Sequence, residues 1–348
     1  MLKKLYYTTR KFGYYYGKII IGILGITLFL TSGLKEANDS SGFQGTTGIE
    51  LKTTDEIRML SEELRIGLNE IQVSYVFQNV TDHPVKTIVV FPLPSLDLSA
   101  GLTAPNWNFP TDNQDFLNFK VWVNDKSIKP TLERRAFFQG KEVTRELETT
   151  GAIALVPWKP GGYDEQAKLL SPQMLKRLRN SGLITEGEDH NTPQWQLHTK
   201  YFWNQTFPPK TNVKVKHIYK PFVGTALIDK ATQINGRSVV GRFIGNHPTD
   251  KDRYCLDEAT KRALVSEEKK NPNSMVFSVA EIEYILTTAR NWRGPIGKFH
   301  LIIDKGSPKN IISLCWNGLK KTGATTFESV ITNFVPGEDI RLLIFVHH

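Results

Sequence analysis

The sequence lacks the short motifs that mark many enzyme and cofactor-binding families. It contains no Gly-x-Ser-x-Gly elbow, no Walker loop, no dinucleotide fingerprint, no His-Glu-x-x-His and no calcium-loop pattern. These absences leave no catalytic residue, no cofactor and no metal site to predict. The sequence therefore leans against an enzyme, unless its catalytic residues lie far apart in the chain.

The chain also lacks paired metal-ligand side chains on its strand-like segments. His198, His217 and His300 lie in such segments, but none has a histidine or carboxylate two residues further on, where it would share the same face. We expect structural roles for these histidines. The densest polar cluster, at residues 186–190, contains a glycine and follows a helical pattern, so it predicts a solvated loop rather than a catalytic pair.

Cysteine is scarce, since Cys255 and Cys315 are the only two and lie 60 residues apart. At this spacing they form no Cys-x-x-Cys pair, which disfavours a redox or metal role. A disulfide between them would stabilise the fold by roughly 4 kcal/mol in the chain-entropy model. We predict this bridge in an oxidising compartment, and two separately buried thiols are the alternative.

Acidic residues are absent before Glu36, whereas five basic residues between positions 3 and 18 precede an apolar run. A basic segment followed by an apolar one is typical of an export signal. The run extends at most over residues 19–34 and contains three glycines, so it is shorter than the roughly 20 residues of a comfortable membrane span. We therefore predict a signal peptide at residues 1–37, or an uncleaved N-terminal anchor.

Two cleavage positions fit this signal. A small-x-small site ends at Gly33, while a second site ends at Ala37 but has Lys35 where a small residue is preferred. If the segment is retained, we expect membrane contact only through residues 19–34. Either outcome places the rest of the chain in a periplasmic or secreted location.

Removing the signal changes the meaning of the net charge. Residues 1–37 hold six basic residues and one acidic residue, so the remaining 38 basic and 34 acidic residues leave +4 of the formal +9. Most of the positive charge therefore belongs to the signal. A basic chain binds nucleic acid through basic residues gathered on one face, and we expect no nucleic-acid partner here.

Short strand-like segments dominate the exported part. Residues 71–77 alternate apolar and polar side chains, residues 79–84 have turn composition, and residues 85–91 are rich in β-branched residues. Together they predict a β-hairpin. Further strands are predicted at residues 119–123, 152–156, 197–203, 213–219, 276–286, 299–303, 311–316, 327–334 and 340–346. This pattern indicates a mainly β fold of antiparallel sandwich layers.

Two short helices interrupt the strands. Ser171 is a suitable N-cap before Pro172, and Gly182 suits the position after the helix end. A second helix is predicted from an Asp257 cap to about Lys270. We expect an N-terminal β-sandwich region at residues 38–225 with a helical insertion at about 159–194. A C-terminal β region at residues 226–348 would contain both cysteines.

Several segments in chain order resemble one known family. They are Asn38-Asp39-Ser40, Phe91-Pro-Leu-Pro94, Phe202-Trp203-Asn-Gln-Thr-Phe207-Pro208, Val215-Lys-His-Ile-Tyr219-Lys-Pro221, Tyr254-Cys255, Asn291-Trp292-Arg-Gly294-Pro295-Ile-Gly297 and Asp304-Lys-Gly306. The chain is similar to bacterial secreted proteins with domain of unknown function 4424. The resemblance implies an exported bacterial protein with no established activity, so it transfers no functional residues. Residues 73–94 also resemble the opening strands of vault and inter-alpha-trypsin domains, which are β-sandwich interaction modules.

Seven tryptophans allow a binding surface to be considered, because exposed aromatic faces bind sugars. Trp122, Trp203 and Trp316 lie in strand patterns and are expected in the core. Trp158 and Trp292 lie beside proline or glycine in loop-like contexts. They are either loop anchors, which are the commoner case, or part of a binding surface.

The combined expectation is a non-enzymatic cell-envelope protein that acts as a structural or interaction module. Envelope proteins or glycans are its expected partners. Two alternatives remain open at this point: an envelope hydrolase acting on glycan or peptide, and a soluble ligand- or glycan-binding protein. β-Sandwiches host all three, so the fold class does not choose among them.

Overall fold

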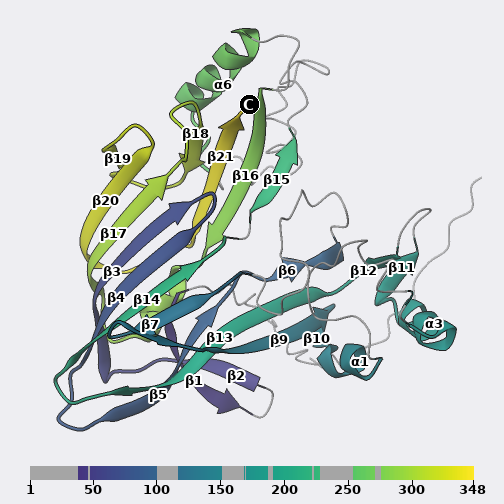
Figure 1. The fold of residues 1–348 in the computed structure, drawn as a ribbon, viewed down its shortest axis with the longest axis horizontal. Coiled ribbons are helices and arrows are strands. Elements are labelled where there is room, and N and C mark those ends of the chain that lie inside the picture. Colours follow the sequence, from purple (N-terminus) through teal and green to yellow (C-terminus); the bar gives the residue numbers. More distant parts are fainter. Residues whose placement is uncertain are drawn as a thin grey trace, which may run out of the picture. The chain divides into compact units, whose positions relative to one another are not determined.

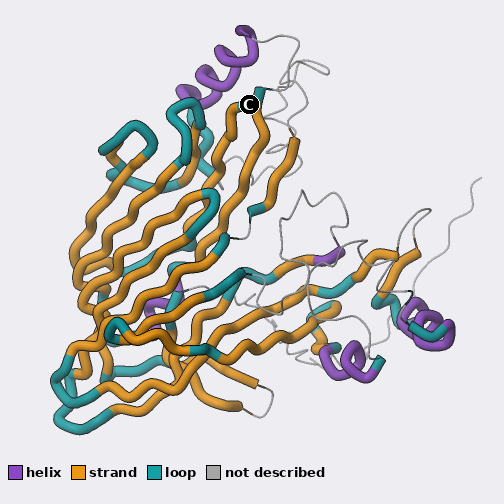
Figure 2. Tube along the Cα trace, viewed as in Figure 1, coloured by secondary structure: helices purple, strands orange, loops and turns teal. Residues whose placement is uncertain are grey.

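Strands make up most of the part of the chain that the structure describes. This computed structural model describes residues 38–45, 48–99, 117–150, 168, 170–186, 191–221, 223–227, 254–270 and 276–348. The helices among them are α1 (Thr144–Thr149), α3 (Pro172–Asn180), α6 (Glu258–Lys270) and the 3-10 helix η2 (Thr287–Asn291). Figure 2 shows how small the helical share is. The prediction of a mainly β fold is confirmed.

Two large sheets contain most of the strands (Figure 1). The seven-stranded sheet has the order β10 (Lys141–Glu142), β9 (Thr131–Phe138), β13 (Gln196–Phe207), β5 (Val85–Pro92), β1 (Ser40–Gly45) and β2 (Gly48–Lys52), and β6 (Leu96–Asp97) also pairs with β13. The eight-stranded sheet has the order β19 (Lys320–Lys321), β20 (Thr326–Phe334), β17 (Ile296–Asp304), β3 (Ile57–Gly67), β4 (Ile71–Asn79), β14 (Asn212–Tyr219), β7 (Lys120–Val123) and β8 (Lys126–Ile128). Most neighbouring strands are antiparallel, whereas β17 and β3 are parallel.

Two smaller sheets complete the described strands. One has the order β15 (Gly224–Leu227), β16 (Phe277–Tyr284), β21 (Ile340–His347) and β18 (Ile311–Leu314), and the other pairs β11 (Ile184–Glu186) with β12 (Asn191–Pro193). The predicted strand at 152–156 lies outside the described residues. No helix among the described residues is long and apolar enough to cross a membrane.

The predicted hairpin between β4 and β5 is wrong, because the two strands enter different sheets. β4 pairs with β3 and β14, whereas β5 pairs with β13 and β1. The connection from β13 to β14 crosses between the same two sheets. Asn79 joins the two crossings, because its Nδ2 donates to the backbone carbonyls of His83 and Phe207 at 2.8 and 2.9 Å. Turn residues at 79–84 therefore mark a sheet-to-sheet crossing.

The main hydrophobic core lies against the inward faces of these sheets and draws on strands from both ends of the chain. Buried residues from β3, β4 and β14 share one cluster with residues from β16, β17 and β21. Strands from both sides of the predicted boundary at 225/226 are thus neighbours in one sheet and one core.

Both predicted helices are confirmed, with the predicted caps. The Ser171 side chain accepts a hydrogen bond from the Met174 N–H, and Gly182 adopts a positive φ of 72° after α3. The Asp257 Oδ1 accepts the Thr260 N–H at 2.7 Å at the start of α6. Such caps satisfy amide groups that the first helical turn leaves unpaired.

The predicted disulfide is present between Cys255 and Cys315, with the two Cα atoms 5.0 Å apart. It joins the segment before α6 to the segment after β18. Leu264 of α6 is buried beside Tyr254 and strand residues of β16 and β21 in a separate small core. The bridge therefore closes the chain around α6 and this small core.

Candidate functional site

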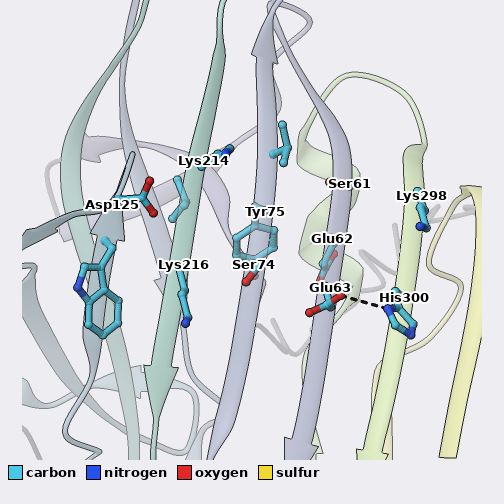
Figure 3. Close-up of a pocket in the computed structure, with 13 residues that line it drawn as sticks. Ser61, Glu62, Glu63, Ser74, Tyr75, Asp125, Lys214, Lys216, Lys298 and His300 are labelled. Atoms are coloured by element: carbon cyan, nitrogen blue, oxygen red, sulfur yellow. Dashed lines mark hydrogen bonds and ion pairs between the residues drawn. The ribbon is translucent and has the colours of Figure 1, made fainter. Parts of the chain in front are cut away.

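A hollow on the solvent-facing side of the eight-stranded sheet is the candidate site (Figure 3). It encloses about 360 Å³ and receives side chains from five adjacent strands, β17, β3, β4, β14 and β7. We call it the outer hollow. Its polar and aromatic lining includes Ser61, Glu63, Ser74, Trp122, Asp125, Lys214, Lys216, Lys298 and His300.

Strand register arranges these side chains in two rows across the sheet. The first row, from β17 to β14, is Lys298, Ser61, Val76 and Lys214. The second row, from β17 to β7, is His300, Glu63, Ser74, Lys216 and Trp122. Neighbouring strands lie about 4.8 Å apart, so the two ends of the first row are about 14 Å from each other. Residues from distant parts of the sequence therefore form one surface.

A tight turn places Trp122 at the end of the second row. Asn124 and Asp125 join β7 to β8, and their φ angles of 47° and 64° fit a two-residue turn of the type that asparagine and aspartate tolerate. The Asn124 Oδ1 accepts the Lys214 N–H at 2.9 Å, which fastens the turn to β14. The Lys216 Nζ consequently lies 6.0 Å from the centre of the Trp122 ring.

The lysines of the outer hollow differ from its histidine in their partners. Lys214, Lys216 and Lys298 are exposed, and none forms an ion pair with a residue in the described ranges. The two ring nitrogens of His300 instead lie 3.2 Å from the Glu63 Oε2 and 2.9 Å from the Glu328 Oε2. These carboxylates are already engaged, whereas the three ammonium groups are open to a negatively charged ligand.

A second polar cluster lies on the inner side of the same sheet. A bulge in β3 between Met59 and Ser61 shifts the strand alternation, so Met59 and Glu62 both face inward. Glu62 is 1% exposed, and burial raises its pKa to about 8. The Asn38 Nδ2 donates to both oxygens of this carboxyl group at 3.2 and 3.0 Å.

Asp39 is fully buried beside Glu62, and we call these two residues the buried carboxyl pair. Burial and the charge of Glu62 raise the pKa of Asp39 well above its ordinary value. Neither Asp39 carboxyl oxygen has a hydrogen-bond partner among the described residues. The His217 Nε2 lies 3.6 Å from the Asp39 Oδ2, but burial lowers the pKa of His217 to about 3, so this imidazole is neutral. The contact therefore supplies no countercharge.

The segment Asn38–Ser40 is held by η2 and the residue after it. The Thr288 Oγ1 accepts the Asn38 N–H at 2.8 Å and donates to the Asn38 carbonyl at 2.9 Å. The Trp292 Nε1 donates to the Asp39 carbonyl at 2.6 Å, and the Asn291 Nδ2 donates to the Ser40 Oγ at 2.8 Å. Residues near the start and near the end of the chain thus form one buried network.

A family model for a domain of unknown function, DUF4424, matches residues 37–343. The chain belongs to this family. No curated protein matches the sequence. The comparisons do not bear out the resemblance of residues 73–94 to vault and inter-alpha-trypsin domains.

Solved structures of two other proteins are distantly similar to the DUF4424 chain. A Legionella pneumophila protein, whose crystal structure is described as that of a candidate nutrient binding protein, is 16% identical with a TM-score of 0.45. That match covers 90% of this chain and 71% of the Legionella chain. Two structures of an M1 zinc metallopeptidase from Deinococcus radiodurans are 6% identical with TM-scores of 0.24 and 0.23. Here the match covers 84% of this chain but only 43% of the metallopeptidase.

The tryptophans considered from sequence occupy different places in the DUF4424 chain. Trp292 is 2% exposed and packs on Phe77, so it is a buried anchor and not part of a binding surface. Trp158 lies outside the described residues. Trp203 is buried as predicted, whereas Trp122 was expected in the core and is only partly buried, in the outer hollow.

Sequence reasoning missed most of both clusters. It gave no role to the buried carboxyl pair, and it treated His217 only as a structural residue. The alternation of valine and lysine at residues 213–216 was a usable signal, because it places Lys214 and Lys216 on the outer face of one strand. Among the described residues, no group of three or more metal-ligating side chains is placed to hold a metal ion.

Proposed function

We propose that this DUF4424 protein is an exported, non-enzymatic envelope module that binds an anionic glycan in the outer hollow. The observation that carries the proposal is the set of three exposed lysines in the outer hollow that have no carboxylate partner among the described residues, one of them beside Trp122. Lys298 and Lys214 stand at opposite ends of one row, and Lys216 stands beside the indole in the next.

The chemistry of the two rows fits an acidic sugar chain. The ammonium groups of Lys298 and Lys214, about 14 Å apart, can each form an ion pair with one acidic group of an extended ligand. The hydroxyl groups of Ser61 and Ser74 lie between them and can donate to or accept from sugar hydroxyls. The partly buried ring of Trp122 offers an apolar surface for the carbon face of a sugar.

Export is supported by the sequence and by the disulfide. The basic segment before residue 19 and the apolar run after it have the order of an export signal. The bridge between Cys255 and Cys315 fits an oxidising compartment, where such bonds persist. An envelope location would bring the outer hollow into contact with glycans.

The buried carboxyl pair does not favour the hydrolase alternative. Glycoside hydrolases use two carboxyl groups that face a bound substrate. Asp39 is 0% exposed and Glu62 is 1% exposed, so neither group meets a substrate in this structure. The pair contributes to packing and to the attachment of the segment that begins at Asn38.

The triple variant Lys214→Ala/Lys216→Ala/Lys298→Ala is expected to bind an oligogalacturonate about tenfold more weakly than the wild type. Three exposed charge contacts worth about 0.5 kcal/mol each give a loss of about 1.5 kcal/mol, which is close to a factor of ten. Isothermal titration calorimetry at low salt measures this affinity. A neutral maltooligosaccharide of equal length should bind much more weakly than the acidic probe.

A matched control removes the same charge elsewhere. Lys86→Ala/Lys141→Ala/Lys269→Ala changes three exposed lysines outside the outer hollow and should leave the affinity within about twofold. Equal losses in both triple variants would mean that net charge alone attracts the probe. That result, or equal binding of the acidic and neutral probes, would contradict the proposed site.

A further inference from the structure

The backbone of Asn38 is buried at a point where the predicted export signal ends. Asn38 is 0% exposed, and its N–H and carbonyl are both bonded to the Thr288 hydroxyl. Asp39, Ser40 and Ser41 are also fully buried.

In the part of the chain that the structure describes, the surroundings of Asn38 contain two carboxyl groups and no cationic partner for them. Among the described residues, no lysine or arginine forms an ion pair with Asp39 or Glu62. His217 is neutral for the reason given above. Buried carboxylates without a countercharge are strongly disfavoured, so the pair in this state retains protons.

We propose that export cleavage after Ala37 creates a mature N-terminus at Asn38, whose α-ammonium group becomes the countercharge of the buried carboxyl pair. The inference rests on the proposed export. A signal peptidase would hydrolyse the Ala37–Asn38 peptide bond with one water molecule, leaving a carboxylate on Ala37 and an amine on Asn38 that takes up a proton. The resulting ammonium keeps its bond to Thr288 and gains two further N–H donors.

The geometry selects this cut over the one after Gly33. The Asn38 side-chain amide already contacts both oxygens of Glu62, and Asp39 is the next residue, so the α-nitrogen belongs to a residue in contact with one acid and adjacent in sequence to the other. A cut after Gly33 would place the new α-amine four residues before Asn38 and would leave the Asn38 nitrogen an uncharged amide. The small side chain of Ala37 suits the position before the cut, although Lys35 does not suit its own.

Cleavage changes how folding stability depends on pH. Without a countercharge, the pKa of Glu62 is raised from its ordinary 4.5 to about 8 by burial. The folded state holds this proton more tightly than the unfolded state, so the contribution of Glu62 to folding stability is fully present below pH 4.5. This contribution decreases between pH 4.5 and 8 and is lost above pH 8. An adjacent α-ammonium favours the ionised carboxylate, so the mature chain should lose little over this range.

Other groups that face the pair do not titrate in the same window. The hydroxyl groups of Tyr75 on β4 and Tyr284 on β16 lie 3.2 Å apart, and burial raises both pKa values, so both stay neutral. His217 on β14 stays neutral as well. Between pH 5 and 8, the titration of this cluster therefore belongs to the buried carboxyl pair and the terminal amine.

The test compares full-length chains that are exported with their own signals and then purified. Mass spectrometry of the wild-type protein should give a mature chain that begins at Asn38. Ala37→Leu should block this cut, and its melting temperature should equal that of the wild type at pH 5 but fall below it by on the order of 5 °C at pH 8. Gly33→Leu is the matched control, and it should leave both the cut and the pH dependence unchanged.

The outcomes separate this inference from the proposed function. A wild-type protein cleaved at Gly33, or identical pH dependence in both variants, would overturn the inference and leave export intact. An uncleaved wild-type protein retained in the cytoplasm would overturn both.

If Ala37→Leu fails to fold, amine labelling of the native wild type provides the test. The Asn38 amine should resist acetylation, and Glu62→Gln should make it at least about tenfold more reactive. Rapid labelling of the wild type would contradict the buried ammonium.

Discussion

Trp292→Ala is expected to lower the free energy of unfolding by about 3–5 kcal/mol, the usual cost of removing a large buried aromatic side chain. Trp292 is 2% exposed, and its ring centre lies 4.7 Å from that of Phe77 and 6.3 Å from that of Phe207. Its Nε1 also donates to the Asp39 carbonyl, so the variant loses a hydrogen bond to the buried segment. Urea unfolding followed by circular dichroism measures the loss.

Trp122→Ala is the natural control, because Trp122 is only partly buried, in the outer hollow. We expect it to change stability by no more than about 1 kcal/mol and to weaken binding of the acidic probe. The two variants thus separate anchoring from binding. A Trp292→Ala protein with wild-type stability and weakened binding would instead indicate that Trp292 belongs to a binding surface.

Cys255→Ser/Cys315→Ser is expected to destabilise the protein by about 4 kcal/mol, because the bridge closes a loop of 60 residues. Without it, the unfolded chain gains conformational freedom while α6 and its small core lose a covalent link to β18. Guanidinium unfolding of the oxidised wild type and of the variant measures the difference.

Reductant provides the control for the Cys255→Ser/Cys315→Ser variant. The reduced wild type should unfold at nearly the same denaturant concentration as the double-serine variant, and reductant should not affect the variant. Two free thiols in the exported protein, or equal stability with and without reductant, would contradict the bridge.

Local patterns predicted the elements whose side chains alternate cleanly. β4 buries every second residue from Ile71 to Asn79, and β14 does so from Val213 to Tyr219. The caps Ser171 and Asp257 likewise predicted α3 and α6, because cap geometry depends on only a few neighbouring residues. Local chemistry is sufficient for such elements.

Other elements were missed because their burial is decided by distant partners. β1 begins with Ser40 and Ser41, which resemble an exposed turn in sequence, and they are buried against strands and loops far along the chain. In β3 the bulge at residue 60 breaks the period of two and hides the inward direction of Glu62. The Cβ of any residue larger than glycine at Gly297 would lie 2.5 Å from the Leu60 carbonyl oxygen, so this bulge depends on a glycine from β17.

Strand pairing explains both the wrong hairpin and the unpredicted outer hollow. A turn between two strand patterns does not determine whether the strands pair with each other or enter separate sheets. The strands on either side of residues 79–84 enter separate sheets. The lysines on β14 meet Lys298 only because β17 joins β3 in parallel across a long sequence separation. A single sequence carries no local signal of that pairing.

The most direct test of binding in the outer hollow is a nuclear magnetic resonance titration of the tryptophan indole N–H signals. The chain has seven tryptophans, and Trp122→Phe identifies the signal of Trp122 by its disappearance. We predict that an oligogalacturonate shifts the Trp122 signal in a saturable way, while the buried Trp195 and Trp292 signals stay in place. An unmoved Trp122 signal at probe concentrations that saturate binding in calorimetry would contradict the outer hollow as the binding site.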